Sequence, residues 1–247
     1  MLQEERKHLI LNQVSQHRKV TTTDLCNLLN VSLDTIRRDL NNLALNGHII
    51  KVHGGAISKT FHIPYQQPKV YAKDEKKNIA QKAMELITEG LVMIWGGGTI
   101  ILELARLIPK YMKGTIYTVS PLVALEIAQR SSINVILLGG RLAPDSYICT
   151  GSPVISQLND IKADLSLISA NGFSAKYGVT EDDWEVAQVK KNILKSADKK
   201  IILSISENLE KRLQVKLTSL TDADFLITEL ETKNRKLAAY RKLIKLR

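Results

Sequence analysis

Between residues 21 and 45, apolar residues recur every three or four positions in two short segments, which the pair Asn30-Val31 separates. This spacing predicts two amphipathic helices joined by a tight turn, with Thr22 or Thr23 capping the first helix and Ser32 capping the second. The buried positions would be Leu25, Leu28 and Leu29 in the first helix, and Leu33, Ile36, Leu40 and Leu43 in the second. Two short helices in this arrangement form a helix-turn-helix.

The segments on either side complete a small domain. Residues 4–17 have the spacing of a supporting helix. Its buried positions would be Leu9, Ile10 and Val14. Residues 48–57 contain two β-prone runs around Gly54-Gly55, which is the pattern of a hairpin. A helix-turn-helix followed at once by a hairpin is a winged helix, so we expect residues 1–58 to fold as one domain.

The outer face of the second helix has the chemistry for contacting DNA. Arg37 and Arg38 project roughly away from Ile36, and a guanidinium can grip a phosphate or bond to the O6 and N7 of guanine. The alternative is an ordinary surface helix with a charged face, but the hairpin that follows favours operator DNA. One such motif reads only a half-site, so we expect an oligomer. The candidate contacts are Ser32, Asp34, Thr35, Arg37, Arg38, Asn41, Lys51 and His53.

From residue 74 to residue 247, apolar runs alternate with amphipathic segments. The expected strands are 91–95, 115–119, 134–138, 164–169, 200–205 and 224–228, and the expected helices begin at 74 and 99 or span 121–130, 153–159 and 183–197. This alternation predicts a parallel sheet covered on both faces, which is a doubly wound, Rossmann-like α/β domain. Residues 59–73 contain two prolines and no clear period, so we expect them to be a linker.

Four loops follow expected strands of this domain, where doubly wound folds place their sites. Residues 96–99, G-G-G-T, precede a helix, and the free backbone N–H groups and helix dipole there favour an anion. The loop matches neither the Walker pattern nor G-x-G-x-x-G. The other loops contain Ser120, then Gly139-Gly140-Arg141, then residues 170–173 followed by 178–180. The alternatives are a tight turn for the glycines, and plain surface positions for Arg141, Glu185 and Lys190.

Composition narrows the class of protein. A chain of 247 residues with 44% hydrophobic and 24% charged residues is typical of a globular protein with two domains. It has no run of eighteen apolar residues and its start is charged, so we expect a cytoplasmic protein. Cys26 and Cys149 fall in different expected domains without ligand spacing. We interpret both as small buried residues and expect no metal and no cofactor.

The net charge of +10 is unevenly distributed. Residues 1–60 hold eight Lys/Arg against five Asp/Glu, and residues 61–231 hold twenty of each. Residues 232–247 hold seven Lys/Arg and no acidic residue. This basic tail either touches DNA or forms a solvated helix face that ends in a short edge strand at residues 244–246.

Two motifs near the start, V-S-L-D-T-I-R-R-D-L at residues 31–40 and K-V-H-G-G-A at residues 51–56, resemble the DNA-binding domain of the DeoR family of bacterial transcription regulators. Later motifs, including G-G-G-T, L-L-G-G-R, N-G-F, G-V-T and E-V-A-Q-V-K, resemble the family's sensor domain, which is related in fold to ribose phosphate isomerase and glucosamine phosphate deaminase. The resemblance covers nearly the whole chain. It implies a repressor of a sugar-metabolism operon, controlled by a phosphorylated sugar.

By the same resemblance, the G-G-G-T loop holds the effector's phosphate and further loop residues line the site. The implied effector residues are Gly96, Gly97, Gly98, Thr99, Ser120, Gly140, Arg141, Asn171, Gly172, Glu185 and Lys190. Two departures bear on this. The family's acidic residue before G-T-T is replaced by Trp95 and glycines, and its D-x-S-K-F is replaced by the sequence that begins at Ser204, S-I-S-E-N.

Catalysis is the competing hypothesis, as in a sugar-phosphate isomerase or deaminase that carries a DNA-binding domain. The five histidines all precede residue 74, so a general base would have to be a carboxylate. The candidates are Glu181, Asp182, Asp183 and Glu185, and no motif distinguishes one of them. We expect a regulator rather than an enzyme. A third possibility is a regulator whose second domain only oligomerises.

Overall fold

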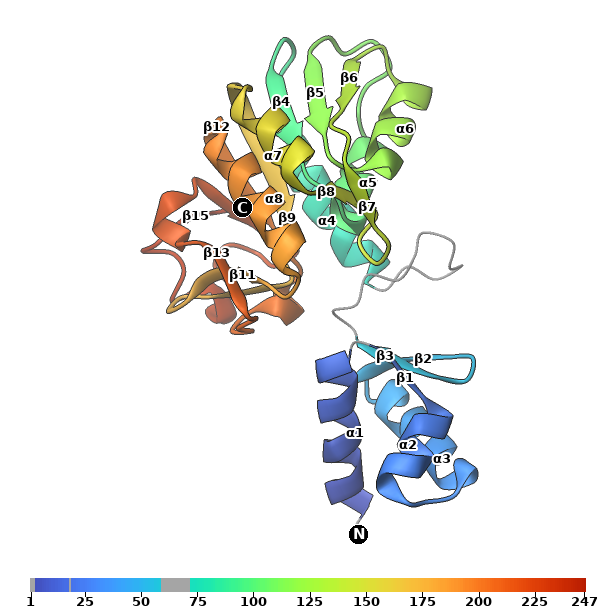
Figure 1. Cartoon of the computed structure of the whole chain (residues 1–247). Helices are drawn as coiled ribbons and strands as arrows, with labels where there is room; N and C mark the ends of the chain where they lie inside the picture. The colour runs from blue at the N-terminus through green and yellow to red at the C-terminus, as the bar shows by residue number, and fades with distance from the viewer. Residues whose placement is uncertain (1–2, 18, 59–71) are drawn as a thin grey trace. The chain divides into compact units, whose positions relative to one another are not determined.

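A computed structural model describes residues 3–17, 19–58 and 72–247, which fold as two compact units (Figure 1). Contacts within the chain divide it into Met1–Ile63 and Pro64–Arg247. Most of the expected linker, residues 59–71, lies outside the described residues. In the described ranges, no helix has the length and apolar character needed to span a membrane.

The first unit is a three-helix domain with a small antiparallel sheet. Its elements are α1 (Gln3–His17), β1 (Lys19–Thr21), α2 (Thr22–Leu29), α3 (Leu33–Leu45), β2 (Ile49–Val52) and β3 (Gly55–Ser58). The strands lie in the order β1-β3-β2, so the expected hairpin β2-β3 gains a third strand that the sequence pattern did not reveal. The three residues of β1 are too few to show a period of two.

The core of this unit confirms most of the predicted apolar stripe. Ile10, Leu25, Ile36 and Leu40 are fully or almost fully buried. Three predicted core positions are wrong, because Leu9, Leu28 and Leu33 are exposed by 40%, 58% and 41%. Leu9 and Leu28 each precede a buried residue by one position, which turns them about 100° around their helix. Leu33 is the first residue of α3, at the end of the buried face.

The turn between the two helices is built from local hydrogen bonds. Ser32 caps α3 as predicted, since its side chain accepts a hydrogen bond from the backbone N–H of Thr35. The predicted cap of α2 is wrong: the cap is Thr21, whose hydroxyl accepts from the N–H of Asp24, and Thr22 is already helical. Asn30 ends α2 in the left-handed conformation, which asparagine tolerates better than most residues.

The second unit alternates helices and strands over most of its length. The helices are α4 (Lys73–Met84), α5 (Thr99–Ala105), α6 (Pro121–Arg130), α7 (Ser152–Asn159) and α8 (Trp184–Lys195). The strands are β4 (Val92–Trp95), β5 (Thr115–Thr118), β6 (Asn134–Leu137), β7 (Arg141–Ala143), β8 (Ile148–Thr150), β9 (Ala163–Ser169), β10 (Gly172–Ser174), β11 (Gly178–Glu181), β12 (Ala197–Leu203), β13 (Val215–Thr218), β14 (Phe225–Ile227) and β15 (Lys245–Leu246).

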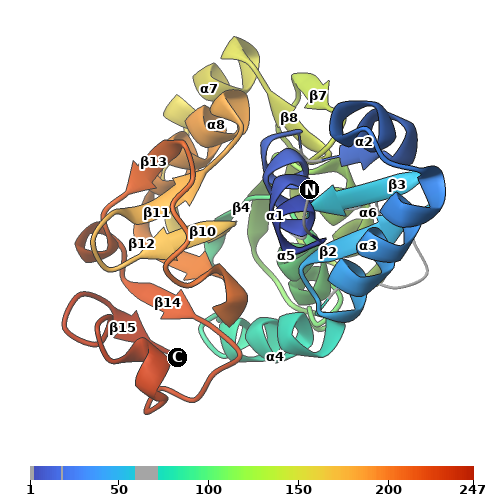
Figure 2. The same ribbon diagram turned by 90° about the horizontal axis from the view of Figure 1, so that it is seen from below.

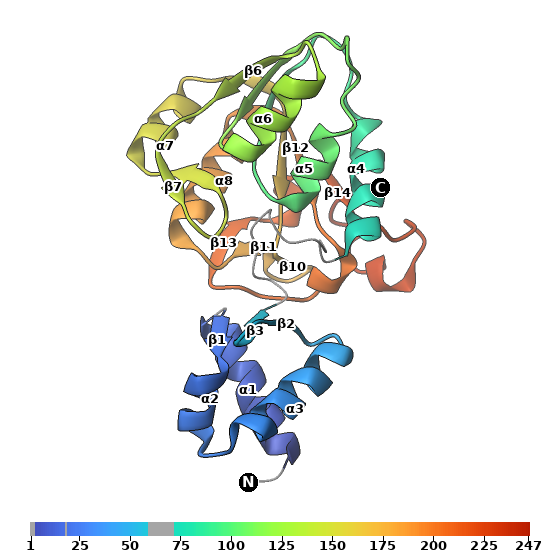
Figure 3. The ribbon, with the colours of Figure 1, turned by 90° about the vertical axis from the view of Figure 1, so that its right-hand side faces the viewer.

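Seven of these strands form one parallel sheet in the order β15-β14-β12-β9-β4-β5-β6. Side chains alternate between its two faces, as in β4, where Met93 and Trp95 join the core with α4, α5 and α6 while Ile94 joins the core with α7 and α8. Figure 3 shows α4, α5 and α6 on one face, and Figure 1 shows α7 and α8 on the other. The predicted doubly wound fold is confirmed.

Two small antiparallel groups were not predicted. β7 and β8 form a hairpin after the loop at Gly139-Gly140. β10, β11 and β13 form a separate sheet, visible beside one another in Figure 2. We expected residues 170–173 and 178–180 to be loops, which is wrong for most of them. β11 gains a partner in β13, more than thirty residues further along, and short-range patterns cannot show such a pairing.

For the basic C-terminal tail, the expected helix is wrong, whereas the expected edge strand is confirmed by β15. The tail contains one short 3-10 turn, Arg235–Leu237, and ends in β15. Tyr240 is buried and packs edge-to-face on Phe173, and its hydroxyl donates to the carboxylate of Glu210. Burial and this hydrogen bond raise the pKa of Tyr240 above its usual value. The tail is therefore held to the small sheet through its apolar residues.

Candidate functional sites

The outward face of α3 is polar and open. Arg37, Arg38 and Asn41 are exposed, while Ile36 and Leu40 on the opposite side are buried. Arg37 lies 3.8 Å from Asp34, a distance at which an exposed pair gives little stability, so the guanidinium stays available. The candidates Ser32 and Thr35 sit at the helix start, where their hydroxyls are 2.9 Å apart. This geometry suits a helix that enters the major groove with its first turns.

A buried ion pair fixes α3 against α1, and sequence reasoning missed it. Asp39, exposed by only 1%, accepts a hydrogen bond of 2.5 Å from Nε of Arg6. The hydrogen bond with Asp39 raises the pKa of Arg6 above its usual value. The signal was present in R-R-D at residues 37–39, because an acidic residue between Arg38 and Leu40 falls on the buried side of the helix.

The hairpin is held to the helix-turn-helix at two points. Nζ of Lys51 donates to Oδ1 of Asn41 at 2.5 Å, so one candidate of the wing touches one candidate of α3. The backbone N–H of Thr22 donates to the carbonyl of Gly54. Gly55 packs so closely on β1 that an added Cβ would lie 2.0 Å from the carbonyl oxygen of Val20. Figure 2 shows β2 beside α3.

The main candidate site of the second unit lies where β4 and β9 end. The chain leaves β4 toward α5 on one face of the sheet and leaves β9 toward α8 on the other face. Adjacent parallel strands whose connections diverge in this way form a topological switch point, the usual ligand position of doubly wound folds. The G-G-G-T loop follows β4 and Asn171 follows β9, so both predicted segments meet there.

Two carbonyls of the G-G-G-T loop accept hydrogen bonds from hydroxyl groups. Ser169 donates to the carbonyl of Gly97 at 2.9 Å, and Thr118 donates to the carbonyl of Gly96 at 3.3 Å. Gly98 has φ +106°, a value that favours glycine, and its carbonyl accepts the first amide bond of α5 from Leu102. The preceding amides of the helix start therefore have no partner within the helix. A Cβ at Gly97 would meet the Ile148 side chain at 2.7 Å.

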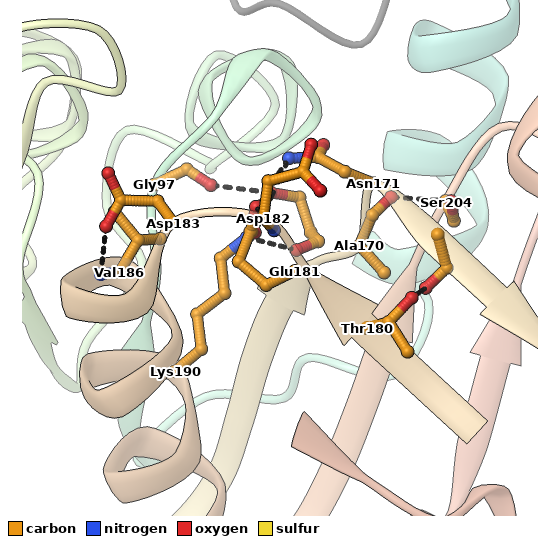
Figure 4. A network of polar contacts seen from close by, with 12 residues as sticks. Gly97, Ala170, Asn171, Thr180, Glu181, Asp182, Asp183, Val186, Lys190 and Ser204 are labelled. Carbon is orange, nitrogen blue, oxygen red and sulfur yellow. Dashed lines mark hydrogen bonds and ion pairs between the residues drawn. The ribbon is translucent and has the colours of Figure 1, made fainter. Parts of the chain in front are cut away.

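Lys190 and Glu181 form a buried ion pair beside this loop (Figure 4). Nζ of Lys190 lies 2.5 Å from Oε2 of Glu181, and it also donates to the carbonyl of Ser169 at 2.9 Å. Asn171 donates to both carboxylate oxygens of Glu181, at 3.2 and 3.4 Å. The side chains of the ion pair are exposed by only 2% and 5%. Ser169 therefore links the Lys190 network to the glycine loop.

The remaining candidates lie around this centre. Glu185 does not meet Lys190, since five positions on a helix turn the two side chains about 140° apart; it faces Arg141 at 3.8 Å, and both are partly exposed. Gly140 packs against β8 and Gly172 lies in β10, where an added Cβ would meet backbone carbonyls at 2.5 and 2.9 Å. Ser120 is buried at the start of α6 and lies against Gly97.

The segment that departs from the family pattern has a structural role here. The hydroxyl of Ser204 donates to the carbonyl of Ala170 at 2.7 Å, and Nδ2 of Asn208 donates to the same carbonyl at 3.1 Å. The backbone N–H of Ser206 donates to the carboxylate of Glu229. The bonds to Ala170 hold the loop that carries Asn171. Ser204 and Asn208, which stand where the family pattern differs, therefore support the site without lining it.

Lys76 lies in the first turn of α4, near three acidic side chains. Burial lowers the pKa of Lys76 to about 8, even though Glu103, Glu75 and Glu207 oppose this shift. Glu103 itself is buried and paired with Arg106 at 2.6 Å. Lys76 is thus charged at neutral pH but loses its proton within the range of ordinary buffers.

Comparison with known proteins gives two family matches. The family described as DeoR-like helix-turn-helix domain matches residues 6–61, and the family described as DeoR C terminal sensor domain matches residues 72–230. The HTH-type transcriptional repressor GlcR of Bacillus subtilis is 33% identical over 93% of this chain and 89% of its own length. The HTH-type transcriptional regulator GlpR of Haloferax volcanii is 32% identical over 93% of this chain and 91% of its own length.

Among solved structures, ribose 5-phosphate isomerase A of Methanocaldococcus jannaschii is similar to part of the chain. The likeness has a TM-score of 0.40 and 17% identity, and it covers 57% of this chain and 56% of the isomerase.

Proposed function

The chain belongs to the DeoR family of transcriptional regulators, and from this premise we propose that it represses a sugar-metabolism operon under the control of a phosphorylated sugar. The first unit binds operator DNA through α3 and the wing, and the second unit binds the effector where β4 and β9 end. The observation that carries the sensor assignment is the G-G-G-T loop, whose carbonyls are anchored by Ser169 and Thr118 while the amides at the start of α5 remain available.

For the DNA half, support comes from the exposure and charge of α3. Arg37, Arg38 and Asn41 project from a helix whose other side is fully packed. Lys51 of the wing contacts Asn41, so the two DNA-reading elements form one continuous surface. We expect the arginines to contact bases or phosphates, and the wing lysine and His53 to add mainly sequence-independent affinity.

For the effector half, charge and hydrogen-bonding capacity support a phosphorylated polyol. Backbone amides at a helix start favour a phosphate group. Asn171 offers hydrogen bonds of both kinds to hydroxyl groups, and it is already oriented by Glu181. The ion pair of Glu181 and Lys190 contributes no net charge. Its role is to hold Asn171 in a fixed orientation.

Control of DNA binding would follow from a shift between two arrangements of the DNA-binding units in an oligomer. An effector moves that equilibrium only as far as its affinities for the two arrangements differ. The loop that carries Asn171 begins at the end of β9, and Tyr240 of the C-terminal segment packs on Phe173 in the adjacent β10. Effector contact at Asn171 would therefore act on the small sheet as well as on the main one.

We propose a regulator without catalytic activity. A general base must accept a proton from the substrate, but the carboxylate of Glu181 already accepts hydrogen bonds from Lys190, Asn171 and the N–H of Asp182. Asp183 caps α8 by accepting from the N–H of Val186. Two of the four candidate carboxylates, those of Glu181 and Asp183, therefore accept hydrogen bonds that hold the fold together.

The test is a titration of phosphorylated sugars and their unphosphorylated parents into the protein–operator complex, read by fluorescence anisotropy. We expect only phosphorylated compounds to change operator affinity. Gly98→Ala should abolish this response while operator binding persists. Gly90→Ala is the matched control, because Gly90 also has positive φ, +88°, with open space around it, but lies before β4. If both variants respond like the parent, or if unphosphorylated sugars act instead, the proposed phosphate site is wrong.

A further inference from the structure

The two edges of the seven-stranded sheet are built differently. β15 has two residues, and Lys245 and Arg247 place charges along it. Short length and lysine are the usual means by which proteins prevent an edge strand from pairing with another chain. β6 has four residues, N-V-I-L, with no charge and no proline. In the part of the chain that the structure describes, β5 is its only strand partner.

The hydrogen-bond pattern shows which groups of β6 point to the open side. Asn134 donates to the carbonyl of Gly114, and Leu138 donates to the carbonyl of Thr118, both on the β5 side. In a parallel pair, alternate residues direct their N–H and C=O groups to opposite sides of the strand. The N–H and C=O groups of Val135 and Leu137 therefore point away from β5.

The side chains around this edge are apolar and incompletely covered. No residue of β6 is buried, although every other strand of the sheet with three or more residues contains buried positions. Leu137 is exposed by 44%. Leu142 in β7, shortly after it in the chain, and Leu125 in α6, which packs against β6, are exposed by 45% and 59%. The edge thus combines free backbone groups with an uncovered apolar surface.

We propose that β6 pairs antiparallel with β6 of a second copy of this chain about a two-fold axis, which joins the two sheets. A strand that meets its own copy about such an axis is complementary to itself, because each outward N–H faces an outward C=O. The uncharged sequence brings no like charges together across the pair. The choice of a second copy as occupant rests on the proposed function, since one winged helix reads only half of a symmetric site.

The experiment is sedimentation equilibrium of the full chain and of Leu137→Lys. We expect the parent to sediment at twice the chain mass of 27.6 kDa, or at a multiple of that value. Leu137→Lys should halve this mass or weaken association at least tenfold, because each lysine would bring a charge to the paired edge and lose water there. Leu137→Pro should act similarly, since it removes one outward N–H but no hydrogen bond to β5.

Leu107→Lys is the matched control, since Leu107 is exposed by 39% in the same unit but lies after α5. Its mass should equal that of the parent. Far-UV circular dichroism of each variant checks that the fold is kept. A parent that is monomeric at micromolar concentration, or a folded Leu137→Lys with the parent's mass, overturns the proposal. The monomeric variant should still bind a half-site, so the interface can fail while the DNA-binding function stands.

Discussion

The proposed DNA-reading face and the proposed effector site are built in opposite ways. The DNA-reading face lies mostly on one helix, α3, and its key side chains are exposed and separated by a few positions. The effector site joins segments that follow β4, β9 and β11, and its central ion pair is buried. An exposed face can change its side chains at little cost to the fold, whereas each polar group of a buried network depends on its partners.

Removing one partner of the buried pair should give the largest effect on stability. Lys190→Met leaves the carboxylate of Glu181 buried without its cation, and such a loss typically costs ~3–5 kcal/mol. Urea denaturation should show this decrease in the transition of the second unit, with the transition of the first unit unchanged. Lys195→Met, at an exposed position of the same helix, is the control. Equal losses in the two variants would contradict the comparison.

Removing a guanidinium from the exposed face should affect binding but not folding. Arg37→Ala and Arg38→Ala should each cost ~1–3 kcal/mol of operator affinity where the arginine meets a base. The melting temperature should stay that of the parent, because neither side chain is packed. Fluorescence anisotropy with the operator measures the loss, and Lys77→Ala in α4 serves as a control for net charge. Full operator protection by the double variant would end the assignment of α3.

Titration of Lys76 should give a smaller effect on stability that depends on pH. The folded pKa of about 8 lies below the usual lysine pKa of 10.5, so between these pH values the unfolded chain binds more protons than the folded one. Folding stability from this group should therefore rise with pH across that window, by at most ~1.4 kcal/mol per pH unit. Below pH 8 the contribution is constant.

Urea denaturation at several pH values from 7 to 10 checks this prediction. The difference in free energy of unfolding between the parent and Lys76→Met should grow in the parent's favour as pH rises through 8. A difference that is the same at every pH would show that the lysine titrates normally.

The smallest expected effect concerns the wing. Lys51→Ala should reduce the slope of log affinity against log salt by ~1 unit, because one phosphate contact releases about one counterion. Sequence preference should be unchanged. Since Lys51 also bonds to Asn41, the variant Asn41→Ala distinguishes the two roles: it removes that bond but keeps the charge, so its salt slope should equal that of the parent. A parental slope for Lys51→Ala would place the wing away from DNA.

More of the helix α3 site than of the second site could be predicted from the sequence, because α3 depends on local spacing and the second site depends on contacts between distant segments. Helix α3, its cap Ser32 and its exposed arginines follow from spacing within thirteen residues. The parallel sheet was also predictable, because continuous apolar runs alternating with helices have few other solutions. The pairing of Glu181 with Lys190 was not predictable, because the two residues lie on different elements, β11 and α8. The correct pairing depends on β11, whose position is fixed by β13 much later in the chain.

The same distinction sets the order in which the two units reach their folded states during synthesis. The apolar core of the winged helix is built from residues between Ile10 and Ala56, so this unit can fold while the ribosome still translates the rest. The second unit must wait, because Tyr240 and β15 belong to its core and sheet edge. A chain that stops early would then carry a DNA-reading domain without its sensor, and a frameshift late in the gene would uncouple repression from the metabolite.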